Sequence, residues 1–176
     1  MNIARRVAAL STLLVLGACA DRHDVLAPFA PASDLEMSVA GPVETSGHFD
    51  ALVDFSTLTL TPRGNNCLLV VGGRLVFTGT ISGVATGTTT ALVFAPCQDV
   101  ATTPPGTYRD VFRSELTFEG TVDGEPARAK VLYQGGVEPG GQIDAHLIFS
   151  NGIAGVLDAD AVVAIGGEYS GSVVVK

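Results

Sequence analysis

The chain has 176 residues, and its 47% hydrophobic against 16% charged residues exclude disorder of the whole chain by composition. Lys and Arg number 10 against 18 Asp and Glu, a formal charge of −8, so no nucleic-acid partner is expected, because phosphate binding needs a basic face. The 21 glycines and 9 prolines, with Val and Thr throughout, favour short strands and turns over a helical bundle.

Residues 1–18 have the pattern of a secretory signal peptide. The arginines Arg5 and Arg6 precede the apolar run Val7–Leu16, and small residues follow it. The run is too short to span a bilayer, for which about 20 apolar residues are needed. Without this leader the mature chain has about 158 residues, a length that fits one domain.

The end of the leader, Leu16-Gly17-Ala18-Cys19, resembles the lipobox of bacterial lipoproteins. The resemblance implies cleavage after Ala18 and acylation of Cys19, which would attach the protein permanently to a membrane of the cell envelope. By the rules of that family, Ala20 favours the outer membrane, on either its periplasmic or its surface face. The alternative is an ordinary secretory signal that happens to precede a cysteine.

Residues 19–46 have the composition of a flexible linker. Pro28, Pro31 and Pro42 stand among Ala, Asp, Glu and Ser, and no long alternation of polar and apolar residues occurs. We therefore expect a lipid-anchored tether over 19–46 and a folded domain over 47–176. A competing possibility is that 26–29 docks onto the domain as a first strand.

From Phe49 onward the apolar residues follow a period of two, which is typical of half-buried antiparallel strands. Leu75 to Ile81, Leu116 to Val122, Ile143 to Phe149 and Leu157 to Ile165 each show this alternation. Breaks fall at 62–66, 72–73, 82–83, 96–106, 123–126, 135–141, 151–152 and 166–167. Of these, 72–73, 151–152 and 166–167 are Gly-Gly or Asn-Gly pairs that suit two-residue hairpin turns.

The order of strands and breaks predicts an all-β fold, an antiparallel meander that closes into a small barrel of about eight strands. A β-sandwich is the alternative. The residues expected to face inward include small ones, which would let the strands coil tightly: Gly79, Gly87, Ala145, Ala159 and Ala161.

Two cysteines, Cys67 and Cys97, remain once Cys19 is acylated, and an even number in an oxidising compartment favours a disulfide. A bridge closing a loop of about 30 residues would stabilise the fold by roughly 3 to 4 kcal/mol. The alternative, a reactive or metal-binding cysteine, needs a nearby His or a CxxC spacing that the sequence lacks.

The chain shows no catalytic motif, and we expect neither a metal nor a cofactor. Asp144 and His146 share one strand face, but that face is polar and is expected to be a solvated surface. The densest polar cluster contains Tyr108, Arg109, Asp110 and Arg113. It could form the entrance of a site for an anionic head group, although a charged edge that discourages aggregation is the favoured interpretation.

The segment from about Gly73 to Val175 resembles the bacterial proteins of the allene oxide cyclase-like barrel group. The resemblance rests on Leu75–Gly83, Leu116–Gly124, Ser150–Val156 and Gly166–Gly171. It implies an eight-stranded barrel with a cavity open at one end. No catalytic residue of the plant cyclases has a match here, so the activity of that group is not carried over.

Three functions are compatible with these observations. The first is a lipid-anchored module that binds a small apolar or amphipathic ligand inside the barrel. The second is a structural or interaction protein of the envelope that contacts another envelope protein through a barrel face or through the loops 96–106 and 135–141. The third is a cyclase-like or isomerase-like enzyme. It ranks behind the other two, because fold analogy alone does not carry function.

Overall fold

The computed structural model describes residues 41–176. Cys19, with its predicted acylation, the signal peptide and the segment 26–29 lie outside the described residues, so the expectations for them stay predictions. Within the part of the chain that the structure describes, no helix is long and apolar enough to cross a membrane.

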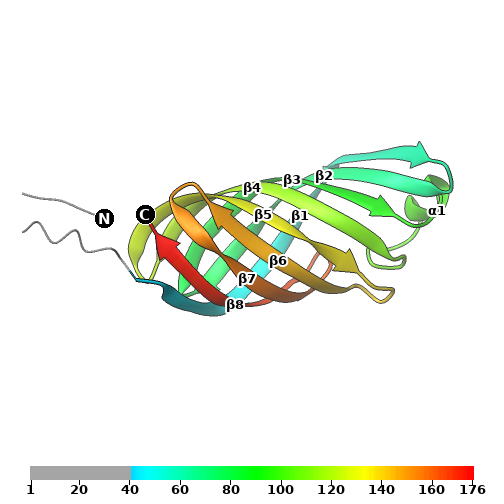
Figure 1. The fold of residues 1–176 in the computed structure, drawn as a ribbon. Helices are drawn as coiled ribbons and strands as arrows, with labels where there is room; N and C mark the ends of the chain where they lie inside the picture. The colour runs from blue at the N-terminus through cyan, green and yellow to red at the C-terminus, as the bar shows by residue number, and fades with distance from the viewer. Residues whose placement is uncertain (1–40) are drawn as a thin grey trace, which may run out of the picture. The chain divides into compact units, whose positions relative to one another are not determined.

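The described residues form a closed antiparallel barrel of eight strands, in which each strand pairs with the next and β8 pairs with β1 (Figure 1). This confirms the predicted meander and barrel. A short helix interrupts the order between β3 and β4. The elements are β1 Val43–Arg63, β2 Asn66–Gly79, β3 Ile81–Val93, α1 Cys97–Val100, β4 Asp110–Val122, β5 Glu125–Val137, β6 Gln142–Ser150, β7 Ile153–Val162 and β8 Gly166–Val175.

The structure confirms some of the predicted turns and places other predicted breaks inside strands. The prediction of a turn at Asn151-Gly152 is confirmed, and both residues have positive φ, 60° and 112°. The turn predicted at 72–73 is wrong, because both glycines lie inside β2 and pair with β1. A Cβ at Gly73 would lie 2.8 Å from the carbonyl oxygen of Leu52, so this glycine serves close strand approach.

Other predicted boundaries also shift in the structure. The break predicted at 82–83 lies inside β3, because β2 ends at Gly79 and β3 begins at Ile81. The glycine pair at 166–167 begins β8, and the turn before it covers 163–165. The first strand begins at Val43 and pairs there with Val173, so the strand starts before the domain boundary predicted at 47.

One end of the barrel is filled by large side chains. The ring of Phe77 packs edge-on against Phe118, Phe149 and Tyr169, with centroid distances of 5.9, 6.3 and 5.7 Å. The Tyr169 hydroxyl accepts a hydrogen bond from the backbone N–H of Ile81 at 3.0 Å, which ties the β2–β3 turn to β8. We call this half of the barrel, with its turns 80, 123–124 and 151–152, the closed end.

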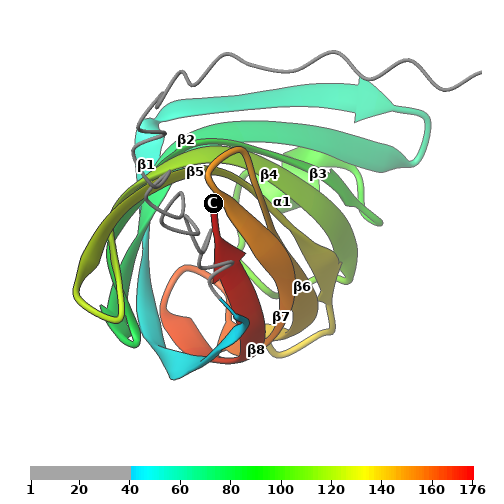
Figure 2. The ribbon, with the colours of Figure 1, turned by 60° about the vertical axis from the view of Figure 1, so that its left-hand side comes forward.

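The opposite end has an uneven wall. β1 to β5 have 13 to 21 residues, whereas β6, β7 and β8 have only 9 or 10. The pairing of β1 with β8 stops at Asp50, and the remainder of β1 continues with β2 beyond the other strands (Figures 1 and 2). The tall strands therefore form one side of this open end, and β6 to β8 form a low rim.

A disulfide joins Cys67 on β2 to Cys97 at the start of α1, the two cysteines that the sequence analysis paired. Cys67 is fully buried and forms a small second apolar cluster with Val93 and Ala95. Tyr108 packs against this cluster. The bridge thus fixes the connection between β3 and β4 onto the tall wall at the open end.

The described residues form the closed barrel and its core. All strand pairs and both apolar clusters lie within 41–176, which belongs to a compact unit covering 38–176. We therefore expect 38–176 to fold without the leader and the tether.

Candidate functional site

The open end of the barrel holds a cavity of about 340 Å³. This volume lies in the range of pockets that bind small molecules, roughly 300 to 1,000 Å³. Phe49, Leu75 and Leu116, which belong to the main core, form part of its lining. The connection 100–108 and the turn before β8 also contribute residues to the lining. The barrel is therefore solid at one end and hollow at the other.

Apolar side chains make up most of the cavity wall. Each of the strands β1 to β7 contributes at least one, because alternation turns every second residue inward. The small side chains of Ala91 and Ala161 leave room where larger residues would fill the barrel. Others in the wall are Ala51, Val53, Phe55, Leu58, Leu69, Val71, Val93, Phe112, Val137 and Ile143.

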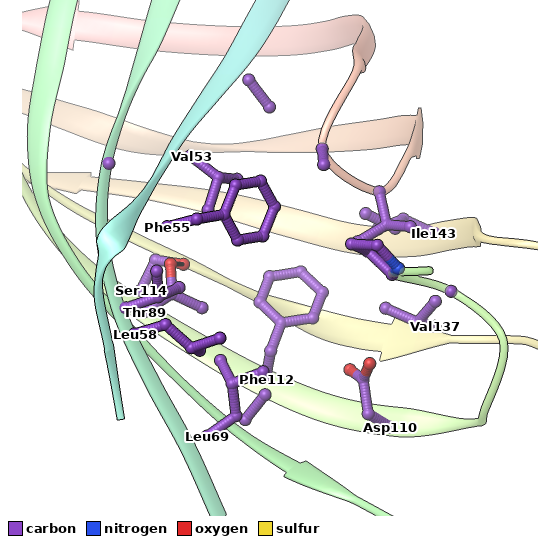
Figure 3. A pocket seen from close by; sticks show the side chains of 18 of the residues that line it. Val53, Phe55, Leu58, Leu69, Thr89, Asp110, Phe112, Ser114, Val137 and Ile143 are labelled. Carbon is purple, nitrogen blue, oxygen red and sulfur yellow. Dashed lines mark hydrogen bonds between the residues drawn. The ribbon is translucent and has the colours of Figure 1, made fainter. Parts of the chain in front are cut away.

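Asp110 is the buried charged residue of this wall. It begins β4 between Val93 of β3 and Val137 of β5, and it is only 8% exposed. Figure 3 shows its carboxyl group and the ring of Phe112 pointing into the same space. Its Oδ1 atom has no hydrogen-bond partner in the protein, and burial raises the pKa of the carboxyl from 3.8 to about 6. The site thus contains an acid with no cation to balance it.

A second buried oxygen without a partner is the hydroxyl of Tyr133 on β5. Its ring lies between Phe112 and Phe49, with centroid distances of 4.9 and 5.7 Å, and burial raises the pKa of its hydroxyl. By contrast, the hydroxyl groups of Thr89 and Ser114 satisfy each other at 2.7 Å. Buried polar groups are nearly always paired, so these two oxygens are free to accept hydrogen bonds from a group that enters the cavity.

An irregularity in β1 places apolar side chains at the mouth. Between the pairs Asp54 with Gly72 and Thr59 with Val70, β1 has extra residues that bulge out of the ladder. Asp54 Oδ1 accepts hydrogen bonds from the backbone and hydroxyl of Ser56, at 3.1 and 2.6 Å, which fixes the bulge. Phe55 and Leu58 in this bulge line the cavity although they are 56% and 37% exposed (Figure 3).

The three residues predicted for a ligand entrance are separated by the structure. Tyr108 lines the cavity, whereas Arg109 and Arg113 do not. Arg109 pairs with Glu138 at 3.3 Å and Arg113 with Glu115 at 3.1 Å, and all four side chains are exposed. These arginines therefore do not form an entrance to this cavity, and the alternation of β4 turns Arg113 outward.

The important residue between them, Asp110, was missed as a site. A signal was present, because Asp110 stands in phase with Phe112, Ser114, Leu116 and Phe118 on the inner face of β4. Asp110 adjoins the arginines along the chain, but its phase on β4 separates it from Arg113.

The other candidate groups lie on the outer surface, as the sequence predicts for Asp144 and His146. His146 contacts Asp158 across the β6–β7 pair at 3.0 Å, and both side chains are exposed. His48 on β1 contacts Glu168 on β8 at 3.1 Å, and this hydrogen bond raises the pKa of the imidazole. Among residues 41–176 no group of three or more metal-ligating side chains is found.

Comparisons with known proteins establish the fold alone. No protein-family model matches the chain, and no curated protein sequence matches it significantly. A solved structure from Shewanella oneidensis MR-1, a protein of unknown function from the DUF3224 family, is similar with a TM-score of 0.51. The two share 14% identity over 77% of this chain and 98% of that one. This barrel is thus similar in architecture to a DUF3224 protein.

Proposed function

We propose that this protein is a lipid-anchored component of the bacterial cell envelope whose barrel binds a small apolar or amphipathic ligand. The observation that carries the proposal is the cavity at the open end, which combines an apolar wall with two buried oxygens that lack partners. Empty apolar cavities in barrels are costly, whereas barrels that hold ligands keep such space.

The position at which β1 begins supports a barrel that is anchored on one side and binds its ligand on the other. β1 starts at Val43 beside Val173, at the closed end, so the barrel is joined to the preceding residues away from the mouth. The disulfide supports an oxidising compartment, since such bonds are rare in the cytosol. The lipobox-like motif that ends in Cys19 and the resemblance to allene oxide cyclase-like barrels are consistent with this proposal.

Native mass spectrometry of the full chain, purified from its own cell envelope, tests the proposal. We expect a mass excess that denaturation removes. The variant Ala91→Phe fills the cavity from β3 and should abolish this excess, while Thr88→Phe, on the exposed face of the same strand, should retain it. An adduct that survives in Ala91→Phe, or a wild-type protein without any adduct, would contradict the proposal. Circular dichroism verifies that both variants keep the β fold.

A further inference from the structure

The side chains of the cavity specify the charge of a ligand's head group as well as an apolar body. Four residues of its lining carry titratable groups: Arg74, Tyr108, Asp110 and Tyr133. Arg74 is exposed and lies out of phase with the buried residues of β2, so it does not face Asp110. Asp110 is therefore a buried carboxyl group that no cation of the lining neutralises.

The surroundings of Asp110 make a second negative charge unfavourable. Valines flank it on both neighbouring strands, and the nearest cation along the chain, Arg109, is directed to Glu138 outside the cavity. The protein as a whole carries a formal charge of −8. An anionic amphiphile would bring its own charge beside a buried carboxylate, whereas an ammonium group would satisfy it with a charge-assisted hydrogen bond.

Aromatic rings complete a site for a cation with an apolar body. Phe55, Phe112 and Tyr108 line the cavity together with Asp110, and ring faces attract ammonium groups. Asp110 lies at the start of β4, at the open end, while Leu116 further along the strand belongs to the core. A ligand would thus hold its head group near the mouth and its tail toward the core.

We propose that the cavity selects amphipathic amines, with the ammonium group bound to the Asp110 carboxylate and the apolar body among Phe55, Phe112 and the aliphatic wall. This inference rests on the proposed function, and it names the ligand class of the same cavity. It excludes fatty-acid anions as preferred ligands, although their tails would fit the wall equally well.

Isothermal titration calorimetry on the barrel segment 38–176 tests the selection with three probes that share one tail: octylammonium, octanol and octanoate. At pH 7.5 octylammonium should bind at least about tenfold more tightly than octanol, and octanoate should bind most weakly. Asp110→Asn keeps the shape of the side chain and removes its charge, so it should bring octylammonium and octanol to within about twofold. Asp144→Asn, on the exposed outer face, removes the same charge and should leave the preference intact.

The pH dependence gives a second readout. The pKa of Asp110 is about 6, so octylammonium should bind less tightly as the pH falls from 7.5 to 5, because the carboxyl group takes up a proton. Octanol binding should hardly change. The other titratable groups of the lining are Arg74, Tyr108 and Tyr133, and burial raises the pKa of the Tyr133 hydroxyl, so this group stays protonated over this range.

The outcomes separate the two proposals. If octanol and octylammonium bind with equal affinity to the wild-type barrel, or if Asp110→Asn keeps the preference, the amine selection is refuted while ligand binding stands. Tighter binding of octanoate than of octylammonium also refutes the selection. If none of the three probes binds, both the selection and the proposed function fail.

Discussion

Replacing Asp110 by Asn should favour the ligand-free barrel more at a pH above the range in which the carboxyl group titrates than at a pH below it. Raising the pKa from 3.8 to about 6 means that the native state holds the proton more tightly than the unfolded chain does. Between these two values the unfolded state loses its proton first, so the free energy of unfolding of the wild type falls as the pH rises. Above about pH 6 the full cost of the buried charge is present.

The magnitude follows from the same pKa. A shift from 3.8 to about 6 corresponds to about 3 kcal/mol for a group fully shielded from water. The carboxyl group faces a cavity that opens to solvent, so screening reduces this to about 1 to 2 kcal/mol. Asn remains neutral throughout, so the stability difference between Asp110→Asn and the wild type should be about 1 to 2 kcal/mol larger at pH 8 than at pH 4.

Urea unfolding followed by far-ultraviolet circular dichroism measures this difference, since the chain has no Trp to serve as a fluorescence probe. Comparing the two pH values cancels any loss that the new amide causes by being unpaired, because that loss is present at both. Asp144→Asn, on the outer surface, serves as the control for a lost charge. An equal difference at pH 4 and pH 8, or a larger stabilisation at pH 4, would refute the burial of an unbalanced carboxylate.

Three further predictions concern the stability of the barrel and the titration of a histidine on its surface. Replacing Cys67 and Cys97 together by Ala should lower the free energy of unfolding by about 3 to 4 kcal/mol in urea, since the bridge joins residues 30 apart; a loss below about 1 kcal/mol would contradict it. Tyr169→Phe should cost about 1 to 3 kcal/mol in the same assay, because it leaves a buried backbone N–H unpaired, and a neutral effect would be inconsistent with the observed hydrogen bond. In an NMR titration His48 should show a pKa above 6.5, and the variant Glu168→Gln should lower this pKa. The small stabilisation from this pair should be present below pH 6.5 and lost as the pH rises through the raised pKa. An unchanged pKa in the variant would exclude the contact with Glu168 as the cause of the raised pKa.

The alternation of apolar and polar residues was enough to predict the barrel, because half-buried antiparallel strands impose a strict period of two. Turn positions were less certain. Glycine has the same appearance in a sequence whether it serves a turn, as Gly152 does, or close strand contact, as Gly73 does. The bulge at Phe55 and Leu58 coincides with a change of phase in the sequence, because the apolar positions pass from Val53 and Phe55 to Leu58 and Leu60. Only pairing with β2 shows that this change is a bulge and not the end of a strand.

The candidate site was only partly predictable. The phase of β4 distinguishes the inward Asp110 from the outward Arg113, and this information was available in the sequence. The cavity itself depends on which inward residues meet across the barrel, and on the uneven strand lengths that leave one end open. Both follow from strand tilt and register, which local patterns do not encode.

Methyl NMR spectra of the barrel segment during an octanol titration test most directly whether one half of the barrel is hollow. Methyl signals from Leu69, Val71 and Ile143, which line the cavity, should shift as ligand binds. Those from Ile81, Ile153 and Val173 at the closed end should stay in place, because large side chains fill that half. Signals that shift equally in both halves, or that do not shift in either, would contradict a barrel built to hold a ligand at its open end.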